Sequence, residues 1–398
     1  MSDRPSFISG IGRNVFFAGL VSLFMDISSE MIYPLLPLFL TGVLGTTKTT
    51  VGVIEGIAEA TASLLKVFSG YLSDRFGKKK LLMGLGYGIS VVSRPVIAGA
   101  STWFEVLTAR FIDRFGKGVR TAPRDALIAD SANSGSMGLA FGFHRSMDTI
   151  GAVLGPAAAF ALLYFYNDDL RLVFYASAVP GLLAVAVIVF FIKERRITKE
   201  EAARVPKLSV SSFNGPFRLY MLVVAIFSLG NFADAFLVLQ AKNLGVHDHM
   251  IPVVYLLFNL VYAASSTPMG MLGDRIGIRN MVLSGFLVYA VVYFLVGLAS
   301  TPLHAWLLFP LYGVYKGMSE GTQKAYLALL APAERKATAF GVYHTVNGLM
   351  LLPASVIAGY LWDTHGAGAT FFYGAAMGLV SAVVFLFLGS GKKEKAGV

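Results

Sequence analysis

The sequence predicts an all-α polytopic membrane protein with twelve transmembrane helices, arranged as two pseudo-symmetric six-helix bundles. Three observations predict this fold class. First, 56% of the 398 residues are hydrophobic and only 14% are charged, which is far less charge than a soluble domain carries. Second, apolar runs of roughly 20 residues, long enough to cross a bilayer, recur along the whole chain. Third, short motifs repeat at a spacing of about 200 residues.

Each apolar run is expected to be a helix, because a backbone surrounded by lipid must satisfy its hydrogen bonds internally. In chain order, the predicted helices lie near residues 14–42, 47–72, 80–99, 103–122, 138–165, 171–192, 216–242, 248–272, 279–299, 303–328, 336–362 and 368–389. The first run is too long for a cleavable signal peptide and lacks a small-residue cleavage site, so we expect it to remain as the first span.

The distribution of basic residues predicts which loops face the cytoplasm. Lys and Arg concentrate in residues 75–80, 193–207 and 392–395, whereas the loops near 99–103 and 299–304 have none. The positive-inside rule therefore places both termini in the cytoplasm, which requires an even number of crossings. We expect a multi-pass protein of the cell (inner) membrane, and no nucleic-acid partner despite the net charge of +10.

The longest polar stretch, residues 193–212, predicts a cytoplasmic linker between an N-terminal bundle (1–192) and a C-terminal bundle (213–398). Three motif pairs support the repeat: GYLSDRFGKKK with GMLGDRIGIRN, KGVRTAPRDAL with KGMSEGTQKAY, and FGFHRSMD with FGVYHTVN. Because each half has six spans, both halves share one orientation and are related by an axis along the membrane normal.

GYLSDRFGKKK resembles the loop between the second and third helices of the major facilitator superfamily, a family of secondary transporters. The resemblance implies the twelve-helix fold of that family and a cytoplasmic gate, in which Asp74 latches the halves together when the cavity faces outward. Membrane topology alone would explain the lysines, but not the Asp or the glycine spacing. The residues that fit this motif in its two copies are Gly70, Asp74, Arg75, Gly77, Asp274 and Arg275.

The fourth predicted helix carries a stripe of charge in the segment RFIDRFGKGVRTAPRD. Arg110, Asp113, Arg114 and Lys117 share one helical face. Lipid would strongly penalise that face, so we expect it to line a cavity or the bundle interior. The pattern RFID…G resembles the fourth helix of the superfamily, although Asp113 replaces a common Gln and Arg114 a common Gly. We predict that the three cations bind substrate and that Asp113 takes part in proton coupling.

The fifth predicted helix contains GFHRSMDTIGAVLGP, which partly matches the signature of the superfamily's antiporters. Its glycines and proline are equally explained by close helix packing. His144, Arg145 and Asp148 share one face. A proton relay through His144 and Asp148, with Arg145 contacting substrate, is one hypothesis; a structural ion-pair cluster is the alternative.

The repeat suggests further substrate-binding residues. It pairs Lys117 with Lys316, Arg145 with His344, and Asp148 with Asn347. Two lysines related in this way would be able to hold an anion between them across a central cavity. Glu320, one turn after Lys316, would instead be able to neutralise it. We expect Lys316, Glu320, His344 and Asn347 to lie at the substrate site.

Three further carboxylates fall within predicted spans. Asp26 and Glu30 lie one turn apart in the first helix, and Asp234 lies in its repeat partner, the seventh. An isolated ionised carboxylate is costly in a low dielectric, so such a group can load and release a proton as a cavity opens to either side. We predict that Asp26, Glu30 or Asp234 carries a coupling proton.

Together these features predict a secondary active transporter working by alternating access. The leading function is proton-coupled efflux of a small anionic or zwitterionic organic solute. The alternatives are proton-coupled or exchange uptake of an organic anion and, more remotely, a non-transporting membrane sensor. The chain has no cysteine, no HExxH motif and no phosphate-binding glycine loop, so an enzyme is not expected. We expect a monomer without a metal or cofactor.

Overall fold

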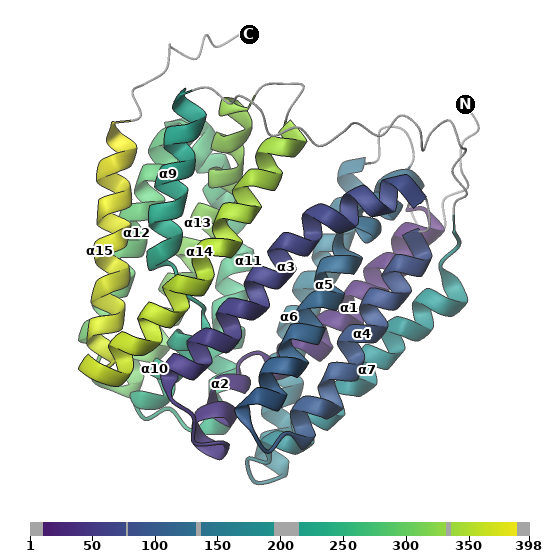
Figure 1. Ribbon diagram of the computed structural model, residues 1–398, viewed down its shortest axis with the longest axis horizontal. Coiled ribbons are helices and arrows are strands. Elements are labelled where there is room, and N and C mark those ends of the chain that lie inside the picture. The colour runs from purple at the N-terminus through teal and green to yellow at the C-terminus, as the bar shows by residue number, and fades with distance from the viewer. Residues whose placement is uncertain (1–10, 77–78, 133–136, 195–214, 332–335, 388–398) are drawn as a thin grey trace.

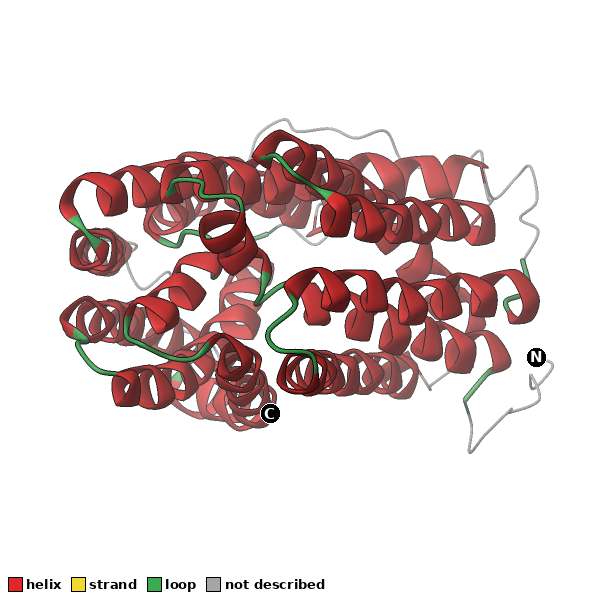
Figure 2. Cartoon of the chain, turned by 90° about the horizontal axis from the view of Figure 1, so that it is seen from below, coloured by secondary structure: helices red, strands yellow, loops and turns green. Residues whose placement is uncertain are grey.

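The computed structural model describes residues 11–76, 79–132, 137–194, 215–331 and 336–387. Over these residues the chain forms helices and connecting loops, as Figure 2 shows, and no β-strand is found there. The N-terminal half contains α1 (Arg13–Ile32), α2 (Leu36–Leu38), η1 (Phe39–Val43), α3 (Lys48–Phe76), α4 (Lys79–Gly99), α5 (Trp103–Ser131), α6 (Met137–Phe165) and α7 (Leu170–Phe191). The C-terminal half contains α9 (Gly215–Gly230), α10 (Ala235–Asn243), η2 (Asp248–Met250), α11 (Ile251–Ile276), α12 (Ile278–Leu298), α13 (Pro302–Leu330), α14 (Lys336–His365) and α15 (Ala367–Leu386).

These helices account for all twelve predicted spans. In the described part of the chain, nine helical segments are long and apolar enough to cross a membrane by composition alone. The other three spans, α3, α5 and α13, carry more polar and charged residues. Several of those residues form ion pairs inside the protein, as described below, so the low hydropathy of these helices reflects their interior position.

The first span of each half is broken. In the first span, α1 ends at Ile32 and α2 begins at Leu36, because Pro34 and Pro37 cannot donate a backbone hydrogen bond to the preceding turn. In the seventh, α9 ends at Gly230 and α10 begins at Ala235. Broken helices at corresponding positions of two repeats are typical of transporter binding sites, where freed polar groups face a cavity.

The two halves form separate bundles that lean together at one end. Figure 1 shows α1 and α3 to α7 on the right and α9 to α15 on the left, with α2 and α10 at the lower end. We call this end, where α2 contacts α10, the α2 end. The opposite end, where α15 finishes, lies at the top of Figure 1, and there the ribbons of the halves diverge.

Helices α3 and α14 run side by side and join the halves. Glycines allow their backbones to approach closely: a Cβ atom added at Gly56 would lie 2.8 Å from the Cα atom of Leu352. The approach is closer still at Gly52, where an added Cβ would meet the carbonyl oxygen of Ser355, and at Gly359, where it would lie 2.5 Å from that of Lys48. This small-residue contact brings the halves together near the α2 end.

Helix α5 extends to Ser131, beyond the boundary near 122 expected from hydropathy. Its last turns are amphipathic rather than apolar. Leu127 packs in a core cluster with Val21 of α1, and Ile128 packs in another with Val15. The helix therefore continues past the apolar segment because its buried face still contacts α1.

Candidate functional site

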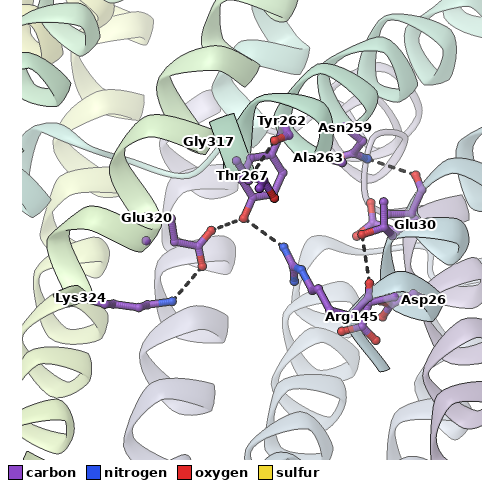
Figure 3. Close-up of a pocket in the computed structure, with 15 residues that line it drawn as sticks. Asp26, Glu30, Arg145, Asn259, Tyr262, Ala263, Thr267, Gly317, Glu320 and Lys324 are labelled. Carbon is purple, nitrogen blue, oxygen red and sulfur yellow. Dashed lines mark hydrogen bonds and ion pairs between the residues drawn. The ribbon is translucent and has the colours of Figure 1, made fainter. Parts of the chain in front are cut away.

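Two adjoining cavities lie between the halves. Cavity A has a volume of about 480 Å³ and is lined by α1, α6, α11 and α13. Cavity B has a volume of about 410 Å³ and is lined by α3, α9, α13 and α14, with Asn231 from the break after α9. Glu320 and Lys324 on α13 line both, so we treat the two as one vestibule with two compartments. Figure 3 shows cavity A.

Three of the carboxylates predicted to take part in proton coupling line cavity A: Asp26, Glu30 and Asp148. Tight packing of α1 against α6 brings them to one wall. A Cβ atom added at Gly151 would lie 2.7 Å from Cβ of Asp26, and one at Gly155 would lie 2.7 Å from Cβ of Glu30. The glycines that resemble an antiporter signature therefore set the distance between the helices that carry these acids.

Asp26 and Glu30 differ from the other acids of the vestibule in their partners. Neither forms an ion pair with any residue that the structure describes, and Oε2 of Glu30 is buried without a hydrogen-bond partner there. The charge of Lys117 nevertheless acts on both of them. The half-buried Lys117 does not itself line either cavity.

Asp148 starts a chain of polar contacts that leads away from cavity A. Its carboxylate lies 3.6 Å from Nδ1 of His144, and Nε2 of His144 lies 2.6 Å from Oγ of Ser22. The Ser22 hydroxyl in turn accepts a hydrogen bond of 3.3 Å from Arg124. His144 is buried, so it contacts the cavity only through Asp148.

A second polar chain crosses cavity A from one half to the other (Figure 3). Arg145 on α6 donates to the hydroxyl of Tyr262 on α11 at 3.1 Å, and that hydroxyl donates to Glu320 on α13. Glu320 also accepts a hydrogen bond of 3.0 Å from Lys324. Arg145 and Glu320 are thus linked through one tyrosine.

Cavity B contains the remaining predicted residues of the C-terminal half: Lys316, Glu320, His344 and Asn347. The partner of Lys316 is Asp234, 3.4 Å away, while Glu320 pairs with Lys324. Asp234 also accepts a hydrogen bond of 2.6 Å from Tyr312. Asn347 accepts one from Ser228 at 2.5 Å. Cavity B therefore holds a lysine fixed by a carboxylate from the helix break.

The charged stripe of α5 lies in the interior of the N-terminal half. Arg110 binds Glu55 on α3 through two hydrogen bonds of 2.7 and 3.1 Å. Asp113 lies 3.5 Å from Arg110 and 3.3 Å from Arg94 on α4. Arg114 lies 3.0 Å from Glu59. None of Arg110, Asp113 and Arg114 lines cavity A or B, although Glu59 lines cavity B.

The predicted gate residues are only partly described. Asp274 and Arg275 are exposed at the end of α11. Two residues later in the motif, Gly277 has φ of +90°, a conformation that favours glycine and permits the abrupt change of direction into α12. Gly77 and the side-chain environments of Gly70, Asp74 and Arg75 lie outside the described residues.

Several site residues were not predicted from the sequence: Arg94, Asn259, Tyr262 and Lys324. Arg94 is a lone charge within an apolar run, which is a signal for an interior ion pair. Lys324 lies in the repeated motif KGMSEGTQKAY. Tyr262 and Asn259 carry no such signal, because polar residues near a helix centre are common in packing interfaces. Among the described residues, no group of three or more His, Cys, Asp or Glu is placed to hold a metal ion.

Comparison with known proteins identifies relatives over nearly the full chain. A family model described as Major Facilitator Superfamily matches residues 18–240 and 220–397. An uncharacterized MFS-type transporter of Methanocaldococcus jannaschii is 33% identical over 384 residues, covering 95% of each chain. A multi-drug resistance efflux pump PmrA homolog of Lactococcus lactis is 24% identical over 366 residues, covering 88% of this chain and 89% of that protein.

Solved structures share the fold at low sequence identity. A crystal structure of the nucleoside transporter NupG, in a mutant form, superposes with a TM-score of 0.79 at 12% identity. It covers 94% of this chain and 99% of the other. At this identity the likeness establishes the arrangement of helices and not the ligand.

Proposed function

The chain belongs to the major facilitator superfamily, and we propose that it exports a small zwitterionic organic solute in exchange for protons. Family membership itself makes the chain a multi-pass membrane transporter of small molecules and not an enzyme. The direction of transport, the coupling to protons and the charge of the solute are our proposal. It depends chiefly on one observation: carboxylates that have no ion-pair partner among the described residues lie in the same vestibule as two lysines.

The two compartments suit the two ends of a zwitterion. Asp26 and Glu30 form an acidic wall of cavity A that would accept an ammonium group. Lys316 and Lys324 line cavity B and would accept a carboxylate or phosphate. Each lysine is held by an acid of its own half, so it is oriented before a solute arrives.

A purely anionic solute is less well supported than the sequence suggested. That expectation came largely from the arginines of the fourth helix. Arg110 and Arg114 are each paired with a glutamate of α3, and neither lines a cavity. Their charge is balanced within the N-terminal half, which leaves the vestibule with acids as well as bases.

Proton coupling is assigned to Asp26 and Glu30. Protonation would remove the charge that holds the ammonium group, so a proton and the solute compete for the same two carboxylates. Competition of this kind gives antiport, because each ligand leaves as the other binds. Asp234 is already held by Lys316 and Tyr312, so we give it the role of orienting Lys316.

The chain from Asp148 through His144 to Ser22 offers a route for that proton. Imidazole can pass a proton between its two nitrogens, and both nitrogens of His144 have polar partners. Asp148 lies on the same wall of cavity A as Asp26, so a proton released by Asp26 would be accepted by Asp148.

Export is favoured by the Lactococcus lactis relative, which is named as an efflux pump homolog. The close α1–α6 contact at Gly151 and Gly155 agrees with the resemblance to antiporters. If both termini lie on the cytoplasmic side of the inner membrane, the end at which the halves diverge is the cytoplasmic end. Solute would then enter the vestibule from inside the cell. We propose that one chain suffices, because both compartments form within it.

The test is transport by purified protein in proteoliposomes with an imposed pH gradient. A panel of zwitterions, anions and cations of similar size is offered outside vesicles with an acidic lumen, while a dye reports lumenal pH. Antiport predicts that zwitterions accumulate as the lumen becomes more alkaline. Solute and protons moving in the same direction would instead support uptake by cotransport. If no solute moved under any gradient, the transport proposal itself would fail and a sensor would be favoured.

A further inference from the structure

A carboxylate of the C-terminal half caps a helix of the N-terminal half. Asp363, near the end of α14, accepts hydrogen bonds from the backbone N–H groups of Lys48 and Thr49 at 3.1 and 2.8 Å. It also accepts one from the hydroxyl of Thr49 at 2.7 Å. Lys48 and Thr49 are the first residues of α3. The first turn of α3 is therefore completed by a residue more than 300 positions away in sequence.

The first N–H groups of a helix have no partner within the helix, and a negative charge there is favourable. In α3 the hydroxyl of Thr47 accepts from the N–H of Thr50 at 3.2 Å. This local cap leaves the two preceding N–H groups to Asp363. The contact thus resembles an ordinary aspartate cap, except that its donor and acceptor belong to different bundles.

The cap lies at the α2 end, where other contacts also join the halves. Gly359, one turn before Asp363, lies tightly against Lys48. On the other side of the interface, His249 of the C-terminal half lies 3.3 Å from Asp168 of the N-terminal half. Opening the molecule at this end would separate α3 from α14, and it would therefore break all three hydrogen bonds to Asp363.

We propose that Asp363 is a positioning residue of the transport cycle. Its carboxylate stabilises the state that is closed at the α2 end by capping α3, and it releases α3 when that end opens. The residue does not touch solute, and it acts through the placement of α3. This role depends only on alternating access between the halves, and not on which solute or ion is transported.

The sequence motif at the other end of α3 is expected to act in the opposite state. Asp74 of the GYLSDRFGKKK motif is expected to latch the halves when the cavity faces outward. Helix α3 would then be held by an aspartate at each end, one in each access state. The position about 200 residues before Asp363 is apolar or aromatic, Leu163 or Tyr164, so the sequence repeat does not predict the contact of Asp363 with α3.

The test measures the distance between the halves at the α2 end. Because the chain contains no cysteine, two cysteines can be introduced for spin labelling without first replacing native ones. Trp103 and Leu303, at the starts of α5 and α13, are 42% and 63% exposed and suit this purpose. Pulsed electron resonance on the full chain in nanodiscs, without substrate or gradient, gives the ratio of short to long distances.

Asp363→Ala should raise the long-distance population relative to the short one by roughly 2- to 30-fold, the range expected for loss of one helix cap. Asp363→Asn, which keeps one acceptor oxygen, should shift it less. The matched control is Asp169→Ala. Asp169 caps α7 through Arg171 and Leu172 at 3.0 and 3.1 Å within one half, so its loss should leave the ratio unchanged.

An unchanged ratio in both Asp363 variants would overturn the proposal, as would an equal shift in the Asp169 control. Thermal unfolding of each variant verifies that the labelled chains are folded. Since the measurement uses no solute or proton gradient, its outcome is independent of the proposed antiport. Failure of one proposal therefore does not imply failure of the other.

Discussion

The guanidinium of Arg110 donates two hydrogen bonds to the carboxylate of Glu55, from Nη2 at 2.7 Å and from Nε at 3.1 Å. Both side chains are 3% exposed. The pair joins α5 to α3, the helix that also contacts the other half. Removing one partner would leave the other charge buried and uncompensated.

We therefore expect Arg110→Leu to destabilise the protein by about 3–5 kcal/mol. The double variant Arg110→Leu with Glu55→Leu should lose much less, because no charge is left alone. The unfolding temperatures of the single and double variants, measured without ligand in the same detergent, test this expectation. If the double variant were as unstable as the single one, the charge itself would not be the cause.

The coupling proposal predicts which carboxylates matter for proton movement. Asp26→Asn and Glu30→Gln remove the only acids of cavity A that lack ion pairs among the described residues. Because each variant leaves the other carboxylate to hold the ammonium group, at least one of them should lose pH-driven solute accumulation while still exchanging solute down its own gradient. Solute counterflow and lumenal pH, measured in the same vesicles, separate the two activities.

Glu105→Gln serves as the control for those variants, because Glu105 caps the first turn of α5 and lines neither cavity. Proton coupling in the Glu105→Gln variant should equal that of the unchanged protein. Full coupling in Asp26→Asn, Glu30→Gln and Asp234→Asn alike would exclude all three residues as the proton carrier.

The sequence predicted the fold well because its signals are local. Hydropathy marks where a segment crosses the bilayer, but it predicted one continuous helix over 14–42, whereas the structure breaks this span between Ile32 and Leu36. The twelve spans differ from expectation mainly at boundaries such as the end of α5. There, burial of Leu127 against α1 outweighs the loss of apolar character, and only the tertiary structure reveals that contact.

The site was less predictable because it depends on partners from other helices. A helical face that holds Arg110 and Arg114 looks the same in sequence whether it lines a cavity or meets two glutamates. The structure distinguishes these cases by placing Glu55 and Glu59 opposite the arginines. Likewise, Lys316 has an acid one turn away on its own helix, yet its partner is Asp234 from the broken seventh span.

The lysines of the repeat allow a test of how the solute's acidic group is bound. Lys316 lines cavity B, whereas its repeat partner Lys117 lines neither cavity. Lys316→Gln should weaken binding of a zwitterion by roughly 10- to 100-fold, the loss expected for a hydrogen bond between charged groups. An analogue lacking the acidic group should lose little. Thermal-shift titration of both ligands measures this difference.

Lys117→Gln is the matched variant for that experiment. It should affect both ligands equally, since Lys117 lines neither cavity and its charge acts on Asp26 and Glu30. Equal losses for both ligands in Lys316→Gln would mean that Lys316 does not contact the acidic group.

The contact between α3 and α14 predicts that a single methyl group changes the access equilibrium. An added Cβ at Gly56 would lie 2.8 Å from Cα of Leu352 and 3.0 Å from its Cδ1 atom, too close for the packing to persist. Gly56→Ala should therefore disfavour the state closed at the α2 end by about 1–3 kcal/mol, as overpacking does in cores. With labels at Trp103 and Leu303, the distance distribution should shift to longer values.

Gly88→Ala on α4, where nothing lies within 4 Å, should leave the distance distribution unchanged and slightly stabilise the helix. A Gly56→Ala distribution that matched the Gly88→Ala one would show that α3 and α14 do not separate during the cycle, and that the halves open elsewhere.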